Sequence, residues 1–548
     1  MRRSGRAALV GAAIAALVTL PGLGVGTLWD NSETAYGEVA REILLTHDWV
    51  VMHWNGAPWF IQPPLYFWCA ALCMLVFGVG SFALRLPAAL ATIAMGALVG
   101  RSVARYAGER VGIYTALILS TSLMQAVIGR LAIMDALLDL FVAATIFAWA
   151  RALESGRSRD VVVGALAAAF GFLAKGPVAP VVALLVLVPY AWWQARCGRL
   201  RMPRAAAWGW GALAFALVAL PWIALLVARI GMHGIAVLIG HYTIGRYTGV
   251  IENQSGPVWY YVPVVILGFF PWIAFLPSAV AASVAAVRDA DAGDDVRALI
   301  RLAWLWAVVP LLFFSFARTK LPNYIALEFP SLAILVAWYF EQAARRGARR
   351  SALYSASIVP LAIAAVAIAV ALFARDNRLT GDVLVVSRDL AIAGAVTGAG
   401  ALLTAAALTR RPWAPLAPYP LAIAAALAMD VLALVALPRV ERFKPIPVLA
   451  ARIDASLLPS DAVAIRGVAG ANGLLFYTRP PVFELAAPGT QPHDGAVPMR
   501  SVICSAPRVW VVAPARRSSQ PTYGRTRVEI TRDGTAALYL YEGPPCVR

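Results

Sequence analysis

Acidic side chains follow the first apolar run of the chain, in the segment WDNSE at positions 29–33. Two more carboxylates, Asp135 and Asp139, follow a later apolar run. A carboxylate near lipid is costly to desolvate, so such groups usually have a task. Beside a hydroxyl group, a carboxylate can act as a general base. Asp30, Glu33 and Asp135 are therefore candidate catalytic residues.

Cationic side chains accompany these acids in the loops between apolar runs. Lysine offers a phosphate a point charge, and arginine offers a bidentate fork. Such cations can stabilise a phosphate leaving group while a carboxylate acts as the base. Together these residue types suggest group transfer from a lipid phosphate. The candidate phosphate-binding cations are Arg85, Arg130, Lys175, Arg246, Arg318 and Lys320.

Each of these residues also has a simpler structural interpretation. Asp30 or Ser32 is a suitable N-cap for a helix that starts near Glu33, and Asp135 is a suitable cap for the helix after it. Lys175 precedes Gly-Pro at a helix end, where its side chain can extend along apolar surface to reach water. The sequence leaves both interpretations open.

The composition indicates a polytopic membrane protein. Of the 548 residues, 61% are hydrophobic and only 14% are charged, which is far from the composition of a soluble domain. The net charge of +18 comes from short Arg-rich loops between apolar runs. The positive-inside rule produces this distribution, so we expect no nucleic-acid partner.

The apolar runs predict about 13 spans, each needing ~20 residues. Arginines flank the first run, which lacks a small-residue cleavage site, so it is expected to be an uncleaved span with a cytoplasmic N-terminus. We expect the bacterial inner membrane and a periplasmic C-terminal domain. The predicted spans are 7–28, 83–103, 112–131, 136–151, 161–174, 178–194, 206–228, 259–286, 301–317, 323–341, 353–374, 389–408 and 416–437.

Residues of about 33–80 are predicted to form periplasmic interfacial helices. The apolar stretch 64–79 is short for a span, and treating it as interfacial keeps the later arginines on the cytoplasmic side. The segment is also rich in Trp and Tyr, as interfacial segments are. The predicted transmembrane domain is then 1–440, with the acids and cations above on its periplasmic face.

Residues 441–548 are predicted to form a small periplasmic α/β domain. A helix is expected over 447–458, and Cys504 and Cys546 are able to pair if the tail is periplasmic. Period-two alternation with turn signals predicts short strands. The expected strands are 462–465, 474–477, 509–512, 528–530 and 537–541.

Several stretches, in order, resemble a known family. They are LWDNSETAYGEVAREIL (28–44), FGFLAKGP (170–177), GPVWYYVPVVILGFFPWIAFLP (256–277) and FFSFARTKLPNYI (313–325). The chain resembles GT-C glycosyltransferases of family 39, in the protein O-mannosyltransferase superfamily. Within them it is most similar to the bacterial 4-amino-4-deoxy-L-arabinose lipid A transferases.

The resemblance implies an integral-membrane enzyme that moves a sugar from undecaprenyl phosphate to a periplasmic acceptor, with inversion. The acceptor would be lipid A or another envelope glycan or protein. By position, Asp135 resembles a second functional aspartate of the family. The residues that resemble donor-phosphate positions are Lys175, Arg246, Lys320 and Tyr324.

The chain departs from the family pattern at two places. The family's Asp-Glu pair reads Ser32-Glu33, so Asp30 or Glu33 would have to act. The family's Phe-Glu-Lys-Pro reads Phe-Ile-Gln-Pro at 60–63. A lipid or glycan transporter and a non-catalytic polyprenyl-phosphate binder are the alternatives. No Gly-rich nucleotide fingerprint is present, and no ligand spacing requires a metal, although a divalent ion is compatible.

Overall fold

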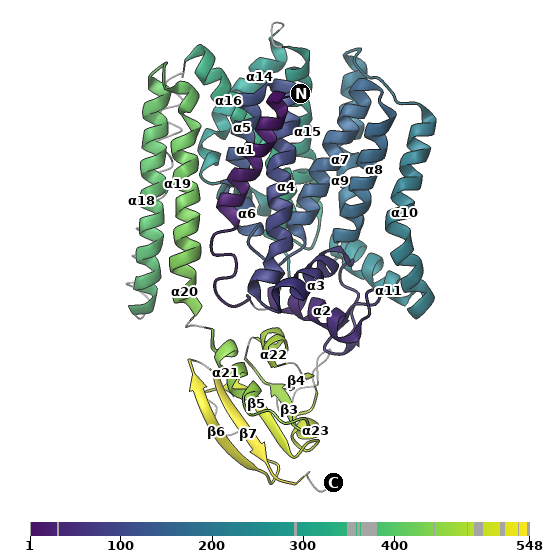
Figure 1. Cartoon of the computed structure of the whole chain (residues 1–548), viewed down its shortest axis with the longest axis vertical. Helices are drawn as coiled ribbons and strands as arrows, with labels where there is room; N and C mark the ends of the chain where they lie inside the picture. Colours follow the sequence, from purple (N-terminus) through teal and green to yellow (C-terminus); the bar gives the residue numbers. More distant parts are fainter. Residues whose placement is uncertain are drawn as a thin grey trace. The chain divides into compact units, whose positions relative to one another are not determined.

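A computed structural model of the chain describes residues 2–29, 32–289, 293–347, 358, 362, 366, 381–441, 444–468, 470–478, 481–486, 497–515, 521–534 and 536–544. The chain forms two compact units (Figure 1). The first comprises Met1–Leu23, Phe60–Tyr66 and Arg85–Ala436. The second comprises Gly24–Trp59, Phe67–Leu84 and Leu437–Arg548. The predicted boundary near residue 440, between a transmembrane domain and a C-terminal domain, stays a prediction.

The first unit is built from long apolar helices. Those before residue 231 are α1 (Arg2–Thr19), α4 (Ser81–Ala107), α5 (Glu109–Ser120), α6 (Leu123–Ile128), α7 (Asp135–Ser155), α8 (Ser158–Lys175), α9 (Val178–Arg196) and α10 (Ala205–Ile230). Short turns follow: α11 (His233–Ile235), the π-helix η1 (Ala236–Gly245), α12 (Arg246–Thr248) and η2 (Val258–Tyr260). The remaining elements are α13 (Tyr261–Gly268), η3 (Trp272–Phe275), α14 (Leu276–Arg288), α15 (Asp294–Phe316), η4 (Pro322–Glu328), α16 (Phe329–Arg346), α18 (Gly381–Thr409), η5 (Ala414–Leu416), α19 (Pro418–Val431) and η6 (Leu432–Ala436).

Eight helices among the described residues are long and apolar enough to cross a membrane. The number is nine if α13 and α14 count as one broken span. Helix α8 has the length of a span but carries charges at both ends. The predicted span 353–374 lies almost wholly outside the described residues. A multi-pass membrane protein is therefore confirmed, whereas the count of 13 stays a prediction.

Two predicted spans are interrupted. The run 259–286 is not one helix, because α13 and α14 are bent by 104° across a break at residues 269–271. Pro271 has no backbone N–H to continue a helix. The carbonyl of Phe270 accepts a hydrogen bond from the Leu123 N–H at 3.0 Å. The run 112–131 breaks after Ser120, where Thr121 accepts a hydrogen bond from the Trp272 indole at 3.0 Å.

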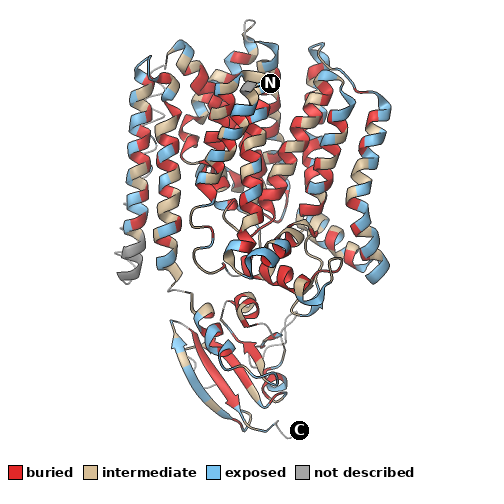
Figure 2. Cartoon of the chain, viewed as in Figure 1, coloured by how far each residue is buried: buried red, intermediate tan, exposed pale blue. Residues whose placement is uncertain are grey.

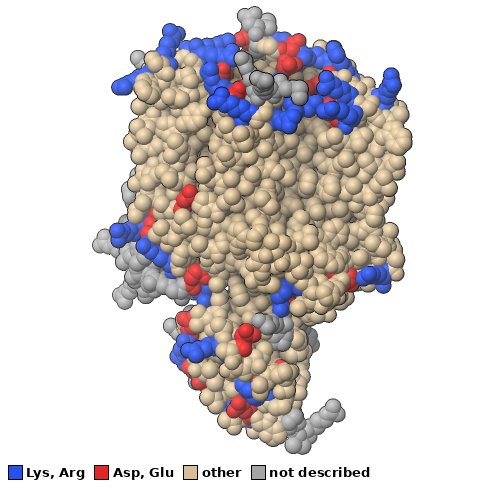
Figure 3. Space-filling view, in the orientation of Figure 1, with Lys and Arg blue, Asp and Glu red and all other residues tan. Residues whose placement is uncertain are grey.

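Ion pairs join the loops at one end of the first unit. Arg110 pairs with Glu341 at 3.6 Å, and Arg346 pairs with Asp289 at 3.0 Å. Figure 3 shows Lys and Arg side chains gathered at this end. The predicted inner loops therefore do come together on one side, which we call the arginine-rich end.

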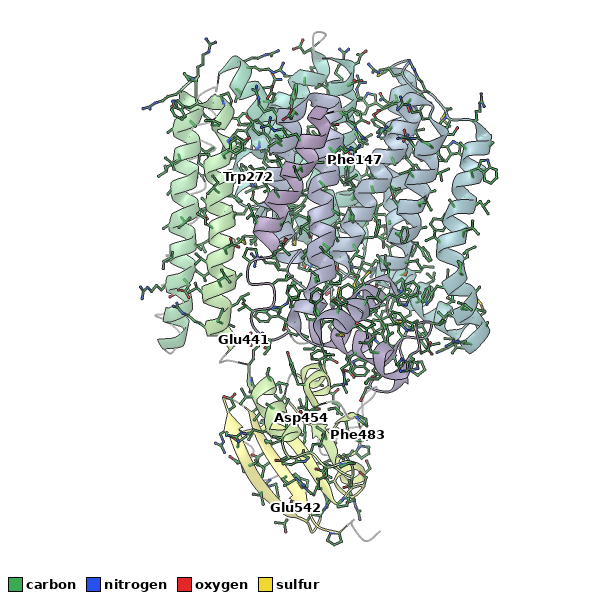
Figure 4. All side chains as sticks on the ribbon, viewed as in Figure 1. Phe147, Trp272, Glu441, Asp454, Phe483 and Glu542 are labelled. Atoms are coloured by element: carbon green, nitrogen blue, oxygen red, sulfur yellow. The ribbon has the colours of Figure 1, made fainter. Side chains whose placement is uncertain are left out.

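The inward faces of these helices are apolar and buried (Figure 2). Trp272 is fully buried, and the ring of Phe147 lies edge-on to Trp306 at 5.6 Å between centroids. Figure 4 shows Phe147 and Trp272 within this helical unit. Many outward apolar side chains, by contrast, are exposed, as expected for helices that contact lipid.

The second unit combines most of the segment 24–84 with the C-terminal residues 437–548. Its elements before residue 85 are α2 (Glu33–Thr46), β1 (His53–Trp54), β2 (Ala57–Pro58) and most of α3 (Leu65–Phe77). The C-terminal elements are α20 (Leu437–Val440), α21 (Pro445–Asp454), β3 (Ala462–Ile465), α22 (Ala471–Thr478), β4 (Val482–Glu484), α23 (Met499–Ile503), β5 (Arg508–Pro514), β6 (Thr526–Asp533) and β7 (Ala536–Glu542). The five C-terminal strands form one sheet in the order β4-β3-β5-β7-β6.

The described C-terminal residues combine helices with this mixed sheet, and their status as a separate α/β domain stays a prediction. Strand β3 is parallel to β4 and β5, whereas β7 is antiparallel to β5 and β6. Four of the five predicted strands are present. The predicted strand 474–477 is wrong, since these residues lie in α22. A short apolar run does not distinguish a strand from a buried helix.

Polar bonds tie the N-terminal part of this unit to its C-terminal part. The side-chain amide of Asn55 donates to the Val482 carbonyl at 2.9 Å and accepts from the Val482 N–H at 3.0 Å. Glu441 accepts hydrogen bonds from Thr27 and from Lys444. Cys504 is disulfide-bonded, and Cys546, the predicted partner, lies outside the described residues.

Helix α2 buries a carboxylate whose titration affects stability. Glu38 forms a bidentate pair with Arg41, with N–O distances of 2.8 and 2.6 Å. Burial, opposed by the Arg41 guanidinium, raises the pKa of Glu38 from 4.5 to about 7. Between pH 4.5 and about 7, the folded state therefore keeps the carboxyl proton of Glu38 to a greater extent than the unfolded state does. Stability is therefore expected to fall as pH rises through this window, by about 3 kcal/mol at most.

The substitution Glu38→Gln is expected to flatten that pH dependence, because glutamine stays neutral. Thermal unfolding of the full chain, measured between pH 4.5 and 7.5, tests this expectation. Glu484→Gln, at an exposed position, is the matched control. An unchanged slope in the Glu38 variant would show that Glu38 does not titrate in this window.

Candidate functional site

Asp135 and Lys175 form a buried ion pair at the end of the first unit opposite to the arginine-rich end. The Lys175 ammonium lies 2.6 Å from Asp135 Oδ1, and the two side chains are 13% and 3% exposed. The Asn323 amide donates to the same oxygen at 2.9 Å. One carboxylate oxygen of Asp135 thus receives two donors, which fixes the positions of both the carboxylate and the ammonium.

The helices place these two charges where the helix dipoles favour them. Asp135 is the first residue of α7, and Lys175 is the last residue of α8. The two helices form a hairpin through the turn at Gly156, so the start of α7 lies beside the end of α8. A carboxylate at a helix N-terminus and a cation at a C-terminus are each stabilised by the macrodipole. Met134, and not Asp135, occupies the N-cap position of α7, so the capping interpretation is wrong for Asp135.

A second pair of groups adjoins the first through Tyr324. The Arg246 guanidinium donates to Tyr324 Oη at 3.1 Å and pairs with Glu252 at 3.1 Å. The Lys175 ammonium lies 5.2 Å from the centre of the Tyr324 ring, within cation–π range. The turn η4 carries Asn323 and Tyr324 side by side, so one short element contacts both Asp135 and Arg246.

Backbone hydrogen bonds hold Arg246 in place. The Thr319 N–H donates to the Arg246 carbonyl at 3.0 Å, and the Lys320 N–H donates to the Gln254 carbonyl at 2.9 Å. The Thr319 hydroxyl, fully buried, donates to the Gly249 carbonyl at 2.8 Å. The segments 246–255 and 318–320 are therefore joined as one paired layer beside the candidate site.

The structure brings only part of the predicted cation set together. Arg130 binds the Val18 and Pro21 carbonyls and Asp430, so its donors anchor the end of α1. Arg85 is buried and donates to the Leu23 carbonyl at 3.2 Å. Arg318 is exposed. These contacts give Arg130 a structural role. They do not test the phosphate-binding roles that the sequence suggests for Arg85 and Arg318, and the donor site proposed for this chain does not include either arginine.

Lys320 lies in the same layer but points toward backbone. Its ammonium donates to the Ser315 carbonyl at 2.8 Å and to the Ala317 carbonyl, at the end of α15. Burial lowers the pKa of Lys320. A cation at this position satisfies carbonyls that the helix end leaves without intrahelical partners.

We therefore expect Lys320→Met to destabilise the protein more than it weakens donor binding. Two lost hydrogen bonds to the helix end should cost about 1–3 kcal/mol of stability. Thermal unfolding and the KM for the lipid-linked donor that the family resemblance implies, measured on the same preparation, separate the two roles. A raised KM with unchanged stability would instead make Lys320 a phosphate ligand.

Three polar residues near the site were missed by the sequence analysis. They are Asn323, Glu252 and Gln125, whose amide donates to Asp139 at 3.2 Å and to the Ala326 carbonyl at 3.0 Å. Asn323 lies in the family-like stretch 313–325, in which the sequence analysis selected Lys320 and Tyr324 but not Asn323. Nothing in the local sequence marks Glu252 as a partner of Arg246, because this contact depends on the folded loop.

The acids of the first loop belong to the second unit. Glu33 begins α2, is fully buried, and accepts the Trp29 N–H at 2.9 Å. Ser32 makes no side-chain capping bond, so its capping interpretation is wrong. Asp30 lies outside the described residues. The catalytic roles of Asp30 and Glu33 stay predictions. Within the described part of the chain, no three His, Cys, Asp or Glu residues gather as a metal site would require.

Comparison with known proteins identifies the relatives of the chain. A family model described as dolichyl-phosphate-mannose-protein mannosyltransferase matches residues 61–224. The undecaprenyl phosphate-alpha-4-amino-4-deoxy-L-arabinose arabinosyl transferase of Edwardsiella ictaluri is 31% identical over 334 residues, 60% of this chain and 57% of that protein. Its counterpart in Pseudomonas aeruginosa strain UCBPP-PA14 is 32% identical over 353 residues, 62% of this chain and 61% of that protein.

A solved structure extends the likeness to almost the whole chain. The crystal structure of ArnT from Cupriavidus metallidurans bound to undecaprenyl phosphate superposes with a TM-score of 0.80, at 22% identity, over 97% of both chains. The chain therefore shares the fold of that structure and is similar in sequence to the arabinosyl transferases named above. The sequence alignments cover less than two thirds of those relatives, so their named activity is carried over below as a proposal.

Proposed function

We propose that the protein is an integral-membrane glycosyltransferase that moves a sugar from undecaprenyl phosphate to a periplasmic acceptor. The observation that carries this proposal is the Asp135–Lys175–Asn323 cluster joined to Arg246 and Tyr324, at the end of the helices opposite to the arginine-rich end. Two fixed cations with a phenol between them suit a phosphate monoester or diester. The named activity of the relatives supports the same donor.

The proposed reaction is a direct displacement at the anomeric carbon. The acceptor oxygen forms a bond to C1 as the bond from C1 to the phosphate oxygen breaks, and the configuration inverts. Asp30 or Glu33 takes the acceptor proton. Lys175, Arg246 and Tyr324 stabilise the charge on the departing undecaprenyl phosphate, and Asp135 holds Lys175 in position.

The orientation follows from the distribution of arginines. We propose that the arginine-rich end faces the bacterial cytoplasm, which the positive-inside rule favours. The cluster around Asp135 then faces the periplasm of the inner membrane. We also propose, from the sequence, a periplasmic C-terminal domain and a full set of about 13 spans. Aminoarabinose is the proposed sugar, because the names of the relatives include it. Lipid A is the proposed acceptor, because the family that the sequence resembles acts on it.

The proposal is tested with the purified chain in lipid nanodiscs. Undecaprenyl phosphate carrying radiolabelled aminoarabinose is incubated with lipid A, and the label on lipid A is counted. Time-dependent transfer supports the proposal. Tight donor binding without transfer to lipid A or to other envelope acceptors would show that the protein binds polyprenyl phosphate without catalysis. This outcome needs testing because Ser32 replaces the aspartate of the family.

A further inference from the structure

A cavity of about 570 Å³ lies at the arginine-rich end, between the ends of α4, α14, α15 and α16. It lies at the opposite end of the first unit from the cluster around Asp135. Its volume is within the ~300–1,000 Å³ of small-molecule sites. No residue of the proposed sugar-transfer site lines it, so the cavity needs a separate explanation.

One wall of the cavity is a smooth apolar surface. Small residues at positions 278, 281, 282, 285 and 286 recur at the three- and four-residue spacing that puts them on one face of α14. Three aromatic residues from α4 and α16 also line the cavity: Tyr106, Trp338 and Tyr339. An apolar slot of this kind, open at a membrane protein's surface, fits a hydrocarbon chain.

The rim of the cavity is cationic. Arg345 pairs with Glu341 at 2.7 Å, Arg346 pairs with Asp289 at 3.0 Å, and Arg110 also reaches Glu341 at 3.6 Å. Among the described residues in these ion pairs, three arginines share two carboxylates, which leaves a positive excess. Arg345 and Arg346 are 63% and 69% exposed, and each of these two ion pairs uses one nitrogen of a guanidinium that has five N–H donors. Further donors are therefore available to an anion.

We propose that this cavity binds an anionic glycerophospholipid. The phosphodiester contacts Arg345 and Arg346, and an acyl chain lies along the small-residue face of α14. Guanidinium groups bind phosphate oxygens by charge-assisted bonds. Basic pockets between the cytoplasmic ends of membrane helices are known to hold such headgroups. The lining combines apolar residues with two arginines, and this combination favours a whole lipid over a free anion.

The test compares lipid binding by the full chain and by two double variants. Delipidated protein in detergent is titrated with phosphatidylglycerol or phosphatidylcholine, and bound lipid is counted by native mass spectrometry. Arg345→Gln with Arg346→Gln should weaken phosphatidylglycerol binding roughly 30-fold, the effect of losing two cationic contacts. The matched control is Arg410→Gln with Arg411→Gln, a second exposed arginine pair that does not line the cavity.

The control pair lies at the same end of the first unit. Tyr114, one helical turn after Arg110, donates a hydrogen bond to the Pro415 carbonyl, close to Arg410 and Arg411. If the cavity selects the lipid, the control variant should keep wild-type affinity for phosphatidylglycerol. If general surface charge attracts the lipid, the control variant should lose affinity as well. Equal losses in the two variants would overturn the proposal.

Two further measurements test the lipid part of the proposal. Ala282→Trp narrows the slot without changing charge and should reduce phosphatidylglycerol binding while sugar transfer persists. Glycerol phosphate, which lacks acyl chains, should not compete at millimolar concentration. Equal binding of phosphatidylglycerol and phosphatidylcholine, or full competition by glycerol phosphate, would contradict a site for an anionic lipid.

Discussion

Asp135→Asn is expected to lower the rate of sugar transfer by ~10²–10³-fold, within the range of general acid–base and electrostatic contributions. Asparagine keeps an oxygen that can accept from Asn323 but removes the negative charge that holds the Lys175 ammonium. Without this counter-ion, Lys175 loses its fixed position beside the proposed phosphate site. The measurement is kcat with the radiolabelled donor at saturation.

Two controls keep this result interpretable. Asp139→Asn removes a buried carboxylate one turn later in α7, where the described contact is with Gln125, and should change transfer much less. Breaking a buried ion pair typically costs ~3–5 kcal/mol, so the thermal stability of both variants must be measured. A stable Asp135 variant with wild-type transfer would remove Asp135 from the site.

Arg246→Ala is expected to lower kcat/KM for the lipid-linked donor by ~10²-fold, since one charge-assisted contact to a leaving phosphate is worth about 3 kcal/mol. Arg246→Lys should recover part of the loss, because lysine keeps the charge but not the fork. Tyr324→Phe should have a smaller effect, because it removes only the hydroxyl that accepts from Arg246.

Arg318→Ala is the matched comparison for Arg246. Arg318 is exposed and adjoins Thr319, whose N–H donates to the Arg246 carbonyl, so both arginines lie in the same paired layer. The account predicts donor kinetics within about twofold of wild type for Arg318→Ala, the usual range for surface changes. An equal loss in both variants would indicate that the layer's total charge, and not the Arg246–Tyr324 geometry, binds the donor.

Sequence reasoning predicted the class of fold well, because hydrophobic runs and arginine-rich loops are strong local signals. It also predicted that Asp135 and Lys175 are functional candidates, since both lie at helix ends next to membrane surface. It did not predict the break at residues 269–271, because an apolar run that contains a proline still has the composition of a span. The helix over 471–478 was misassigned for a similar reason, since a short apolar run lacks periodicity.

The individual contacts of the site were beyond prediction from sequence. Asn323 reaches Asp135 across 188 positions, and Tyr324 reaches Arg246 across 78. Lys320 has the residue type of a phosphate ligand, yet its ammonium satisfies carbonyls at the end of α15. Residue type and spacing define which groups are available, whereas tertiary packing decides which of them remain free for a ligand.

The most direct test of the account is a cryo-EM structure of the chain with undecaprenyl phosphate in nanodiscs. The account predicts phosphate density within hydrogen-bond distance, about 3 Å, of both Lys175 Nζ and the Arg246 guanidinium. Phosphate density that contacts neither residue, with the ion pair of Lys175 and Asp135 undisturbed, would contradict it.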